Sequence, residues 1–354
     1  MVIYYALLVI SIFFSKINEH FKILISGYKI QIIYIINVII LLAVAMLRSE
    51  NIGKDTPHYE IYFNNILIGN TSDLPYEPGF YFITRTFQYF SNDFQFFLAF
   101  CSLITLIPIL YVLKKENNNY FWITIFIFIS TQYVSSFSII RGYLAMAFIL
   151  FAYQFINNPA KKKMYWLFMF IALLFHYFTF IYMCLLWLSK KRIKIRYYLI
   201  SLFVAGFFVI PHVGEYSRGL AINILDYIRP GYSYYGMDVE MNTSGVYIFI
   251  FGIIVILSII YYEQLVKINN KNEILIKISI LLLIFNISMS WFPAYSRLSS
   301  SALIFMALLV PEIIKCEGNR ATRFIYKIGF CMIFIIYMYL NLPPLYSIYS
   351  LNDH

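Results

Sequence analysis

The chain has 354 residues, of which 61% are hydrophobic and 12% are charged, and its mean hydropathy is +0.74. These values exclude a soluble globular domain and are typical of a protein with many membrane spans. The formal net charge of +10 does not indicate nucleic-acid binding, because an excess of basic residues in cytoplasmic loops produces the same sign. Long polar insertions are absent from the sequence, so we expect a single integral membrane domain over residues 1–354.

The fold expected from the hydrophobic runs is all-helical, with about ten spans of roughly 20 apolar residues each. The first run lacks a basic n-region and a small-residue cleavage site, so we interpret it as a retained helix rather than a signal peptide. Lysines that follow this run predict a cytoplasmic loop, which places both termini outside. The predicted spans cover residues 2–15, 30–47, 94–113, two spans within 120–156, 197–211, 245–262, 274–292, 298–314 and 324–342.

Residues 164–188 do not fit a single crossing, because clusters of lysine and arginine lie on both sides of them. A hairpin of two short helices keeps both clusters cytoplasmic. Each arm of about 11 residues rises roughly 16 Å, about half of the ~30 Å hydrocarbon core. We therefore expect His176 to lie near the midplane, and twelve crossings instead of ten if both arms span fully.

Two external loops are expected, at residues 48–93 and 212–244. Within the first, residues 76–90 are too short and too polar to span and can form an interfacial helix. A cluster of small hydroxyl residues at 135–138 predicts the turn between the two spans of residues 120–156.

Basic residues are sorted by the predicted topology, which places 20 of the 27 lysines and arginines inside. Topology does not require the remaining seven, and six of these are arginine, whose planar fork suits bidentate contacts with phosphate. The seven external residues are Arg48, Lys54, Arg85, Arg141, Arg218, Arg229 and Arg297.

Two of these arginines open predicted inward helices. Arg141 follows the turn at 135–138, and Arg297 follows an aromatic interface segment. Because a helix N-terminus favours anions, each arginine is a candidate for binding phosphate. The alternative is an arginine that reaches the interface or pairs with an external carboxylate. Arg48 ends an outward helix, where the dipole already favours a cation.

Other candidates are weaker when taken alone. Asp55 and Glu77 fit ordinary turns, and either carboxylate is also a candidate general base for a sugar hydroxyl. His176 lies among apolar residues, where a hydrogen-bonded structural role is common. The four cysteines show no spacing typical of a zinc site or of an external disulfide framework, and nucleotide-binding and hydrolase motifs are absent from the sequence, so we expect neither metal nor cofactor.

Several different short motifs follow one another along the chain. Arg48 ends the second span and precedes a G-x-D-x-x-x-Y motif formed by Gly53, Asp55 and Tyr59. The motifs that follow are Glu77-x-Gly79-Phe80, Arg141-Gly142-Tyr143-Leu144-Ala145, the lone His176, and Tyr295 with Arg297.

In this order and spacing, the chain resembles the EpsG-like group of bacterial polysaccharide polymerases, which includes Wzy-type O-antigen polymerases. The resemblance covers nearly the whole chain, and its specificity comes from the set rather than from any one motif. Gly142 stands where the family usually has glutamine, so this chain lacks that amide.

The resemblance implies a GT-C-like glycosyltransferase in a bacterial inner membrane, which moves a glycan from undecaprenyl pyrophosphate to a new lipid-linked repeat unit at the periplasmic face. It implies undecaprenyl-pyrophosphate-linked oligosaccharide and membrane lipid as partners, and a membrane protein that regulates chain length as a further one. It implies no metal.

Arginines then take the role of stabilising the leaving group. We expect Arg141 and Arg297 to hold the pyrophosphate, with Arg48 in support. His176 either orients an arginine or acts as the base. The remaining expected contacts with substrate or acceptor are Asp55, Tyr59, Glu77, Arg218 and Tyr295.

Two other functions remain open. A flippase for lipid-linked oligosaccharides would line a pathway through the membrane with its arginines. Two features argue against it: the charges gather at the outer ends of the spans, and the spans lack paired Gly/Pro breaks. A membrane O-acyltransferase that acetylates the glycan would use His176 near an acyl donor.

Overall fold

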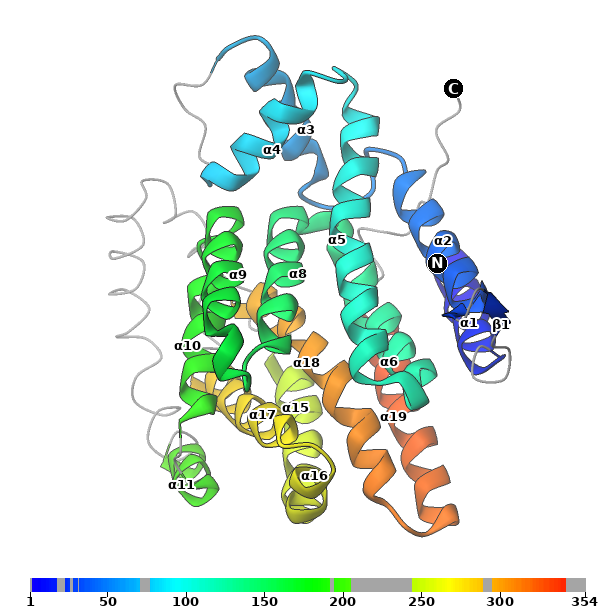
Figure 1. The fold of residues 1–354 in the computed structure, drawn as a ribbon, viewed down its shortest axis with the longest axis vertical. Helices are drawn as coiled ribbons and strands as arrows, with labels where there is room; N and C mark the ends of the chain where they lie inside the picture. The colour runs from blue at the N-terminus through cyan, green and yellow to red at the C-terminus, as the bar shows by residue number, and fades with distance from the viewer. Residues whose placement is uncertain are drawn as a thin grey trace. The chain divides into compact units, whose positions relative to one another are not determined.

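The protein is described by a computed structural model that covers residues 2–17, 23–25, 28–30, 32–70, 77–191, 194–204, 244–288 and 295–341. Helices dominate these residues, as the sequence predicts (Figure 1). The exception is an antiparallel hairpin of β1 (Ile23–Ile25) and β2 (Tyr28–Ile30), which pairs Ile23 with Ile30. This hairpin lies in the first loop predicted to be cytoplasmic.

The chain divides into two compact units. The first unit comprises residues 1–183 and 328–354, and the second comprises residues 184–327. Two helices cross the boundaries between the units, α10 (Thr179–Lys190) and α19 (Arg320–Asn341). This division does not test the expectation of a single membrane domain.

The first unit is built around the long helix α5 (Phe94–Glu116), which packs against the apolar helices α2 and α8. Its buried face is formed mainly by leucine, isoleucine and phenylalanine side chains, and burial of this apolar surface stabilises the unit. Its other elements are α1 (Val2–Ile17), α2 (Ile32–Met46), α3 (Thr56–Leu67), α4 (Pro78–Gln88), α6 (Phe121–Phe128), the π-turn η2 (Ile129–Tyr133), α7 (Ser135–Ser138), α8 (Ile140–Gln154) and α9 (Lys162–Phe175), with the 3₁₀ turns η1 (Asn118–Tyr120) and η3 (Pro159–Lys161).

The second unit packs α17 (Lys271–Ser288) against α15 (Ser244–Ile260) and α18 (Tyr295–Cys316). Its remaining described helices are α11 (Ile195–Val204) and α16 (Tyr262–Ile268). The chain bends by 80° between α15 and α16. The ends of the predicted spans 245–262, 274–292, 298–314 and 324–342 lie within four residues of the ends of α15, α17, α18 and α19.

Three helices of the described residues are long and apolar enough to cross a membrane, or up to four if the bent pair α15–α16 counts as one span. These helices and the overall hydropathy indicate a membrane-embedded protein. The three are Phe94–Glu116, Leu298–Cys316 and Arg320–Asn341. Several other helices are apolar but shorter, so the expected number of about ten spans stays a prediction.

The segment predicted as an external loop contains two helices. Within the predicted interfacial helix at residues 76–90, Pro78–Gln88 form α4, and the interfacial position of this helix stays a prediction. We did not predict α3, although a proline in its first turn is a typical start signal. Gln88 Nε2 donates to the Phe63 carbonyl at 2.7 Å and joins α4 to α3. Figure 1 shows both helices at the end of the first unit where α5 and α8 begin.

The predicted turn at 135–138 is a single helical turn, α7, between η2 and α8. The π-turn η2 precedes it and keeps its polar side chains buried, and Tyr143 of α8 donates to Gln132 Oε1 at 2.8 Å. Residues 120–156 therefore form two helical segments with α7 between them, as expected.

Candidate functional site

A glycine in α4 allows this helix to approach the end of α9 closely. A Cβ atom added at Gly79 would lie 2.7 Å from the Leu174 carbonyl oxygen and 2.8 Å from its carbon. Because those atoms belong to the backbone, no small adjustment would make room for a side chain. The absence of a Cβ therefore lets Glu77, the residue before α4, reach the residues that follow α9.

Glu77 connects a cation and an imidazole. Its side chain is only 4% exposed, and Oε2 forms a short ion pair with Arg141 Nη1. Oε1 accepts hydrogen bonds from His176 Nδ1 at 3.1 Å and from the backbone N–H of Tyr177 at 3.3 Å. Three segments that lie far apart in the sequence, from α4, α8 and the end of α9, thus meet at one carboxylate.

These contacts keep Glu77 ionised. Burial alone raises the pKa of this carboxyl group, but the hydrogen bond from His176 and the positive charge of Arg141 outweigh burial and lower the pKa to about 2. A carboxylate can only accept hydrogen bonds, so His176 Nδ1 carries the hydrogen in this pair. In the neutral ring, Nε2 is then an acceptor.

The same contact links two predictions about depth. Glu77 belongs to the segment predicted to be external, and His176 was expected near the midplane. Since the two side chains are hydrogen-bonded, they lie at nearly the same depth, so the two predictions cannot both hold as stated. The helix leading to it is also longer than the predicted arm, because α9 has 14 residues.

Arg141 is the second residue of α8, as the sequence predicts, and its side chain is 16% exposed. Its Nε donates to the Tyr59 hydroxyl at 3.5 Å, and its guanidinium lies 5.8 Å from the centre of the Tyr59 ring. Burial raises the pKa of Tyr59, against the opposing effect of Arg141, so this hydroxyl stays protonated. Tyr59 and Glu77 together hold the guanidinium in place.

The G-x-D loop docks on the turn that precedes α8. Gly53 has a φ of 110°, and a Cβ there would lie 2.9 Å from the Phe137 carbonyl oxygen. The backbone N–H of Asp55 donates to Ser138 Oγ at 3.1 Å, and Thr56 Oγ1 donates to the Phe137 carbonyl at 3.2 Å. Gly53 is therefore required by both its conformation and its contact, and the loop fixes the position from which Arg141 emerges.

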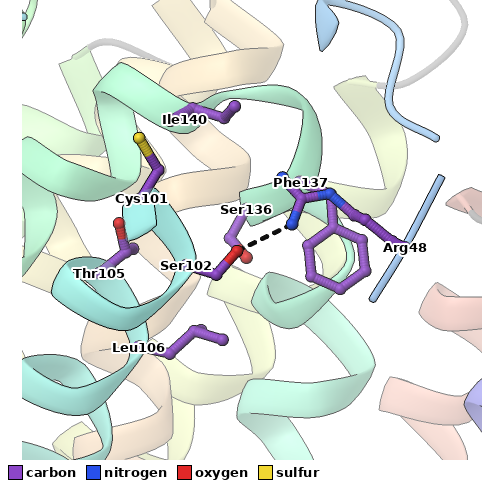
Figure 2. A pocket seen from close by; sticks show the side chains of 8 residues that line it. All are labelled: Arg48, Cys101, Ser102, Thr105, Leu106, Ser136, Phe137 and Ile140. Atoms are coloured by element: carbon purple, nitrogen blue, oxygen red, sulfur yellow. Dashed lines mark hydrogen bonds between the residues drawn. The ribbon is translucent and has the colours of Figure 1, made fainter. Parts of the chain in front are cut away.

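Arg48 contacts the same turn before α8 at Phe137 and is 1% exposed. Its Nη1 donates to Ser102 Oγ at 2.8 Å and also to the Ala45 carbonyl, and its guanidinium lies 4.7 Å from the centre of the Phe137 ring (Figure 2). The small cavity beside it encloses about 10 Å³, close to the least volume that one water molecule needs. Arg48 therefore connects α2, α5 and α7, and the cavity beside it is too small for a pyrophosphate.

Three predicted site residues have side chains outside the described residues. Residue 297 is the third residue of α18 and residue 295 its first, which confirms that an arginine opens this helix. The side chains of Arg297 and Tyr295 are not described, and Arg218 lies wholly outside the described ranges, as does the predicted loop 212–244. Their expected roles stay predictions.

Sequence reasoning overlooked the supporting residues. Ser102 and Phe137 hold Arg48, and Ser138 holds the loop at Asp55. The cluster at 135–138 predicted a turn but not these contacts, and a single serine in an apolar run such as Ser102 carries no signal of this role. Within the described ranges, no group of three or more His, Cys, Asp or Glu side chains is placed to hold a metal ion; the expectation of a metal-free site remains a prediction.

The geometry agrees with the motif order from which a family resemblance was inferred. The model of the EpsG family matches residues 31–350, nearly the whole chain. The chain therefore belongs to the EpsG family, whose members are Wzy-type polymerases. Membership suggests a general role in polysaccharide polymerisation and is consistent with a glycosyltransferase-like enzyme. No curated protein and no solved structure matches the chain significantly, so the expected GT-C-like fold stays a prediction.

Proposed function

We propose that this protein polymerises a bacterial surface polysaccharide, an O-antigen or a capsule. It transfers a growing glycan from undecaprenyl pyrophosphate onto a new lipid-linked repeat unit at the periplasmic face of the inner membrane, with both termini on that side. The observation that carries this proposal is the cluster of Arg141, Glu77 and His176, which combines a cation, a buried carboxylate and an oriented imidazole.

The proposed reaction is a displacement at the anomeric carbon of the donor sugar. A hydroxyl oxygen of the acceptor forms the new glycosidic bond while its proton moves to His176 Nε2. The bond between the anomeric carbon and the pyrophosphate oxygen breaks, and the electron pair leaves with the lipid pyrophosphate. Arg141 stabilises the negative charge that develops on this leaving group.

Glu77 supports both roles in this proposal without acting as the base. A carboxylate with a pKa of about 2 binds a proton too weakly at neutral pH to accept one from a sugar hydroxyl. Its contacts with Arg141 and His176 instead orient the cation and the ring. An ionised carboxylate on Nδ1 also stabilises the imidazolium that forms when Nε2 takes a proton.

The remaining residues complete the proposal with less direct support. Arg297 is the second ligand of the pyrophosphate, and Arg48 acts indirectly by holding the turn at Phe137. Asp55 and Tyr59 belong to the acceptor side in this proposal; the Tyr59 hydroxyl accepts a hydrogen bond from Arg141, and the charge of Asp55 raises the pKa of Tyr59. The side chains proposed to contact substrate outside the described residues are Arg218 and Tyr295. The proposal includes no metal or cofactor, and a chain-length regulator in the membrane is an additional proposed partner.

Analysis of surface glycans distinguishes this function from its two rivals. In a strain that lacks the gene, we expect lipid carrying one repeat unit and no ladder on electrophoresis, and we expect the intact gene to restore the ladder. Loss of a flippase would remove surface glycan altogether, and loss of an O-acetyltransferase would leave chain length unchanged. Either of these two results would contradict the proposed polymerase.

A further inference from the structure

The imidazole of His176 has one engaged edge and one open edge. Nδ1 is hydrogen-bonded to Glu77. At Nε2 no described residue forms a hydrogen bond, and the side chain remains 22% exposed. The Cδ2–Nε2 edge faces α8 at Gly142, where an added Cβ would lie 3.6 Å from Cδ2 and 3.9 Å from Nε2.

Gly142 differs from the other two glycines around the site. Gly53 requires its positive φ, and Gly79 contacts the backbone of Leu174 so closely that no side chain fits. Gly142 has no positive φ, and the atom nearest to its added Cβ is a methyl carbon of Ile139, Cγ2, at 2.8 Å. The Ile139 side chain would have to shift to admit a Cβ here, but no backbone atom stands within 4 Å among the three nearest atoms, so the close backbone contacts that require Gly53 and Gly79 are not found at Gly142.

Glycine nevertheless carries a cost in a helix, about 0.5–1 kcal/mol relative to alanine. Gly142 lies in the first turn of α8, directly after Arg141. A side chain at this position would extend along the open edge of the imidazole, which is the edge that can accept a proton. The feature that distinguishes glycine here is therefore the space it leaves beside Nε2.

We propose that Gly142 is a specificity-determining residue, which keeps the Nε2 edge of His176 open to the hydroxyl group of an acceptor sugar. This inference depends on the proposed polymerase function. The acceptor oxygen approaches between α8 and the ring, its proton passes to Nε2, and the oxygen bonds to the anomeric carbon as the pyrophosphate leaves. The glutamine that the family usually has at this position would narrow this approach, so Gly142 sets which acceptor hydroxyl reaches Nε2 in this chain.

Kinetics of purified Gly142→Ala and Gly142→Leu variants test this role. With donor held constant, we expect kcat/KM for the lipid-linked acceptor to fall slightly for alanine and at least about tenfold for leucine, which corresponds to about 1.4 kcal/mol. The KM for the donor should remain at the wild-type value. Matched controls are Gly329→Ala and Gly329→Leu in α19, where an added Cβ meets no atom within 4 Å.

Accessibility of the ring provides a readout that does not depend on catalysis. Diethyl pyrocarbonate modifies imidazole nitrogens, and mass spectrometry can compare His176 with the exposed His58 in the same sample. We expect the ratio of modification at His176 to that at His58 to fall at least about tenfold in Gly142→Leu, the equivalent of about 1.4 kcal/mol, and to remain unchanged in the Gly329 variants.

The two measurements separate the possible failures. Wild-type acceptor kinetics in Gly142→Leu would overturn the role of Gly142 while leaving the polymerase proposal intact. A wild-type protein that does not polymerise lipid-linked repeats would overturn the proposed function, and loss of modification in Gly142→Leu would then still establish the open edge. If the leucine variant does not fold, unchanged kinetics and unchanged His176 modification in Gly142→Ala would overturn the proposal.

Discussion

At the scale of single residues, the site depends on one carboxylate that serves two partners. Glu77 is buried, and without Arg141 and His176 its burial would favour the neutral acid. Both partners lower its pKa, so the ionised form holds the guanidinium and fixes the hydrogen of the imidazole on Nδ1. Orientation of the catalytic groups and stability of the folded site therefore depend on the same charge.

A Glu77→Gln variant should reveal this charge through the pH dependence of stability. Because the pKa of Glu77 is lower in the folded state than its ordinary value of 4.5, the ionised group stabilises the fold fully above pH 4.5. This stabilisation is lost as the pH falls to about 2. At pH 7 we expect unfolding of the variant to require about 1–3 kcal/mol less than that of the wild type. Thermal unfolding in detergent between pH 7 and 3 measures the difference, which should shrink below pH 4.5.

Glu263→Gln, at an exposed carboxyl group of α16, is the matched control and should show no such trend. A constant difference between Glu77→Gln and the wild type at every pH would mean that Glu77 stabilises the fold through its shape rather than its charge.

Sequence reasoning at this scale identified the residues but not their partners. Arg141 was expected at a helix start because it follows the predicted turn at 135–138, and a functional role was expected because an ionisable residue at membrane depth is unusual. Its pairing with Glu77 crosses 64 positions of the chain, and no pattern in the sequence specifies which carboxylate an arginine meets. Burial of Arg48 was equally hidden, because it depends on Ser102 and Phe137 from two other helices.

At the scale of elements, α4 places the site. Its buried face contacts α3 through Phe80 and Gln88, and its first turn contacts the end of α9 through Gly79. Its other face exposes Tyr81, Phe82 and Arg85. Exposed aromatic rings beside an arginine are typical of a helix in the membrane interface, so the helix that carries Glu77 fits the predicted interfacial position.

A Gly79→Ala substitution should separate α4 from α9. The new methyl group would meet the backbone of Leu174, which can yield only if the two helices move apart. We expect destabilisation of about 1–3 kcal/mol and loss of the glycan ladder, because Glu77 would no longer reach His176. Thermal unfolding of the purified variant and electrophoresis of glycans from the complemented strain measure the two effects.

Gly329→Ala again provides the control, since its added methyl meets nothing nearby. A Gly79→Ala variant with wild-type stability and a full ladder would show that the close approach of α4 to α9 is unnecessary.

Elements with continuous apolar runs were predictable within a few residues, since hydrophobic length decides them. The short helix α3 was missed because it lies in a polar stretch where turns and helices have similar signals. The hairpin of β1 and β2 was missed because strands of three residues are too short to show a period. The expected depth of His176 came from counting the length of the arm, and such a count does not include the hydrogen bond that joins His176 to Glu77.

At the scale of the whole molecule, the cluster of Arg141, Glu77 and His176 lies within the first unit, and Arg297 belongs to the second. The charge sorting of the sequence predicts that both arginines lie on the outer side of the membrane. The match to the EpsG family model covers residues 31–350 and so includes residues of both units.

The most direct test of the polymerase site is an assay of purified protein, reconstituted in lipid, with a lipid-linked repeat unit as the sole substrate. We expect the wild type to produce a ladder of products. Arg141→Lys should keep the charge but lose the planar fork that contacts phosphate, so its rate should fall about a hundredfold or more while its thermal unfolding remains cooperative. A full ladder from folded Arg141→Lys at the wild-type rate would contradict the proposed site.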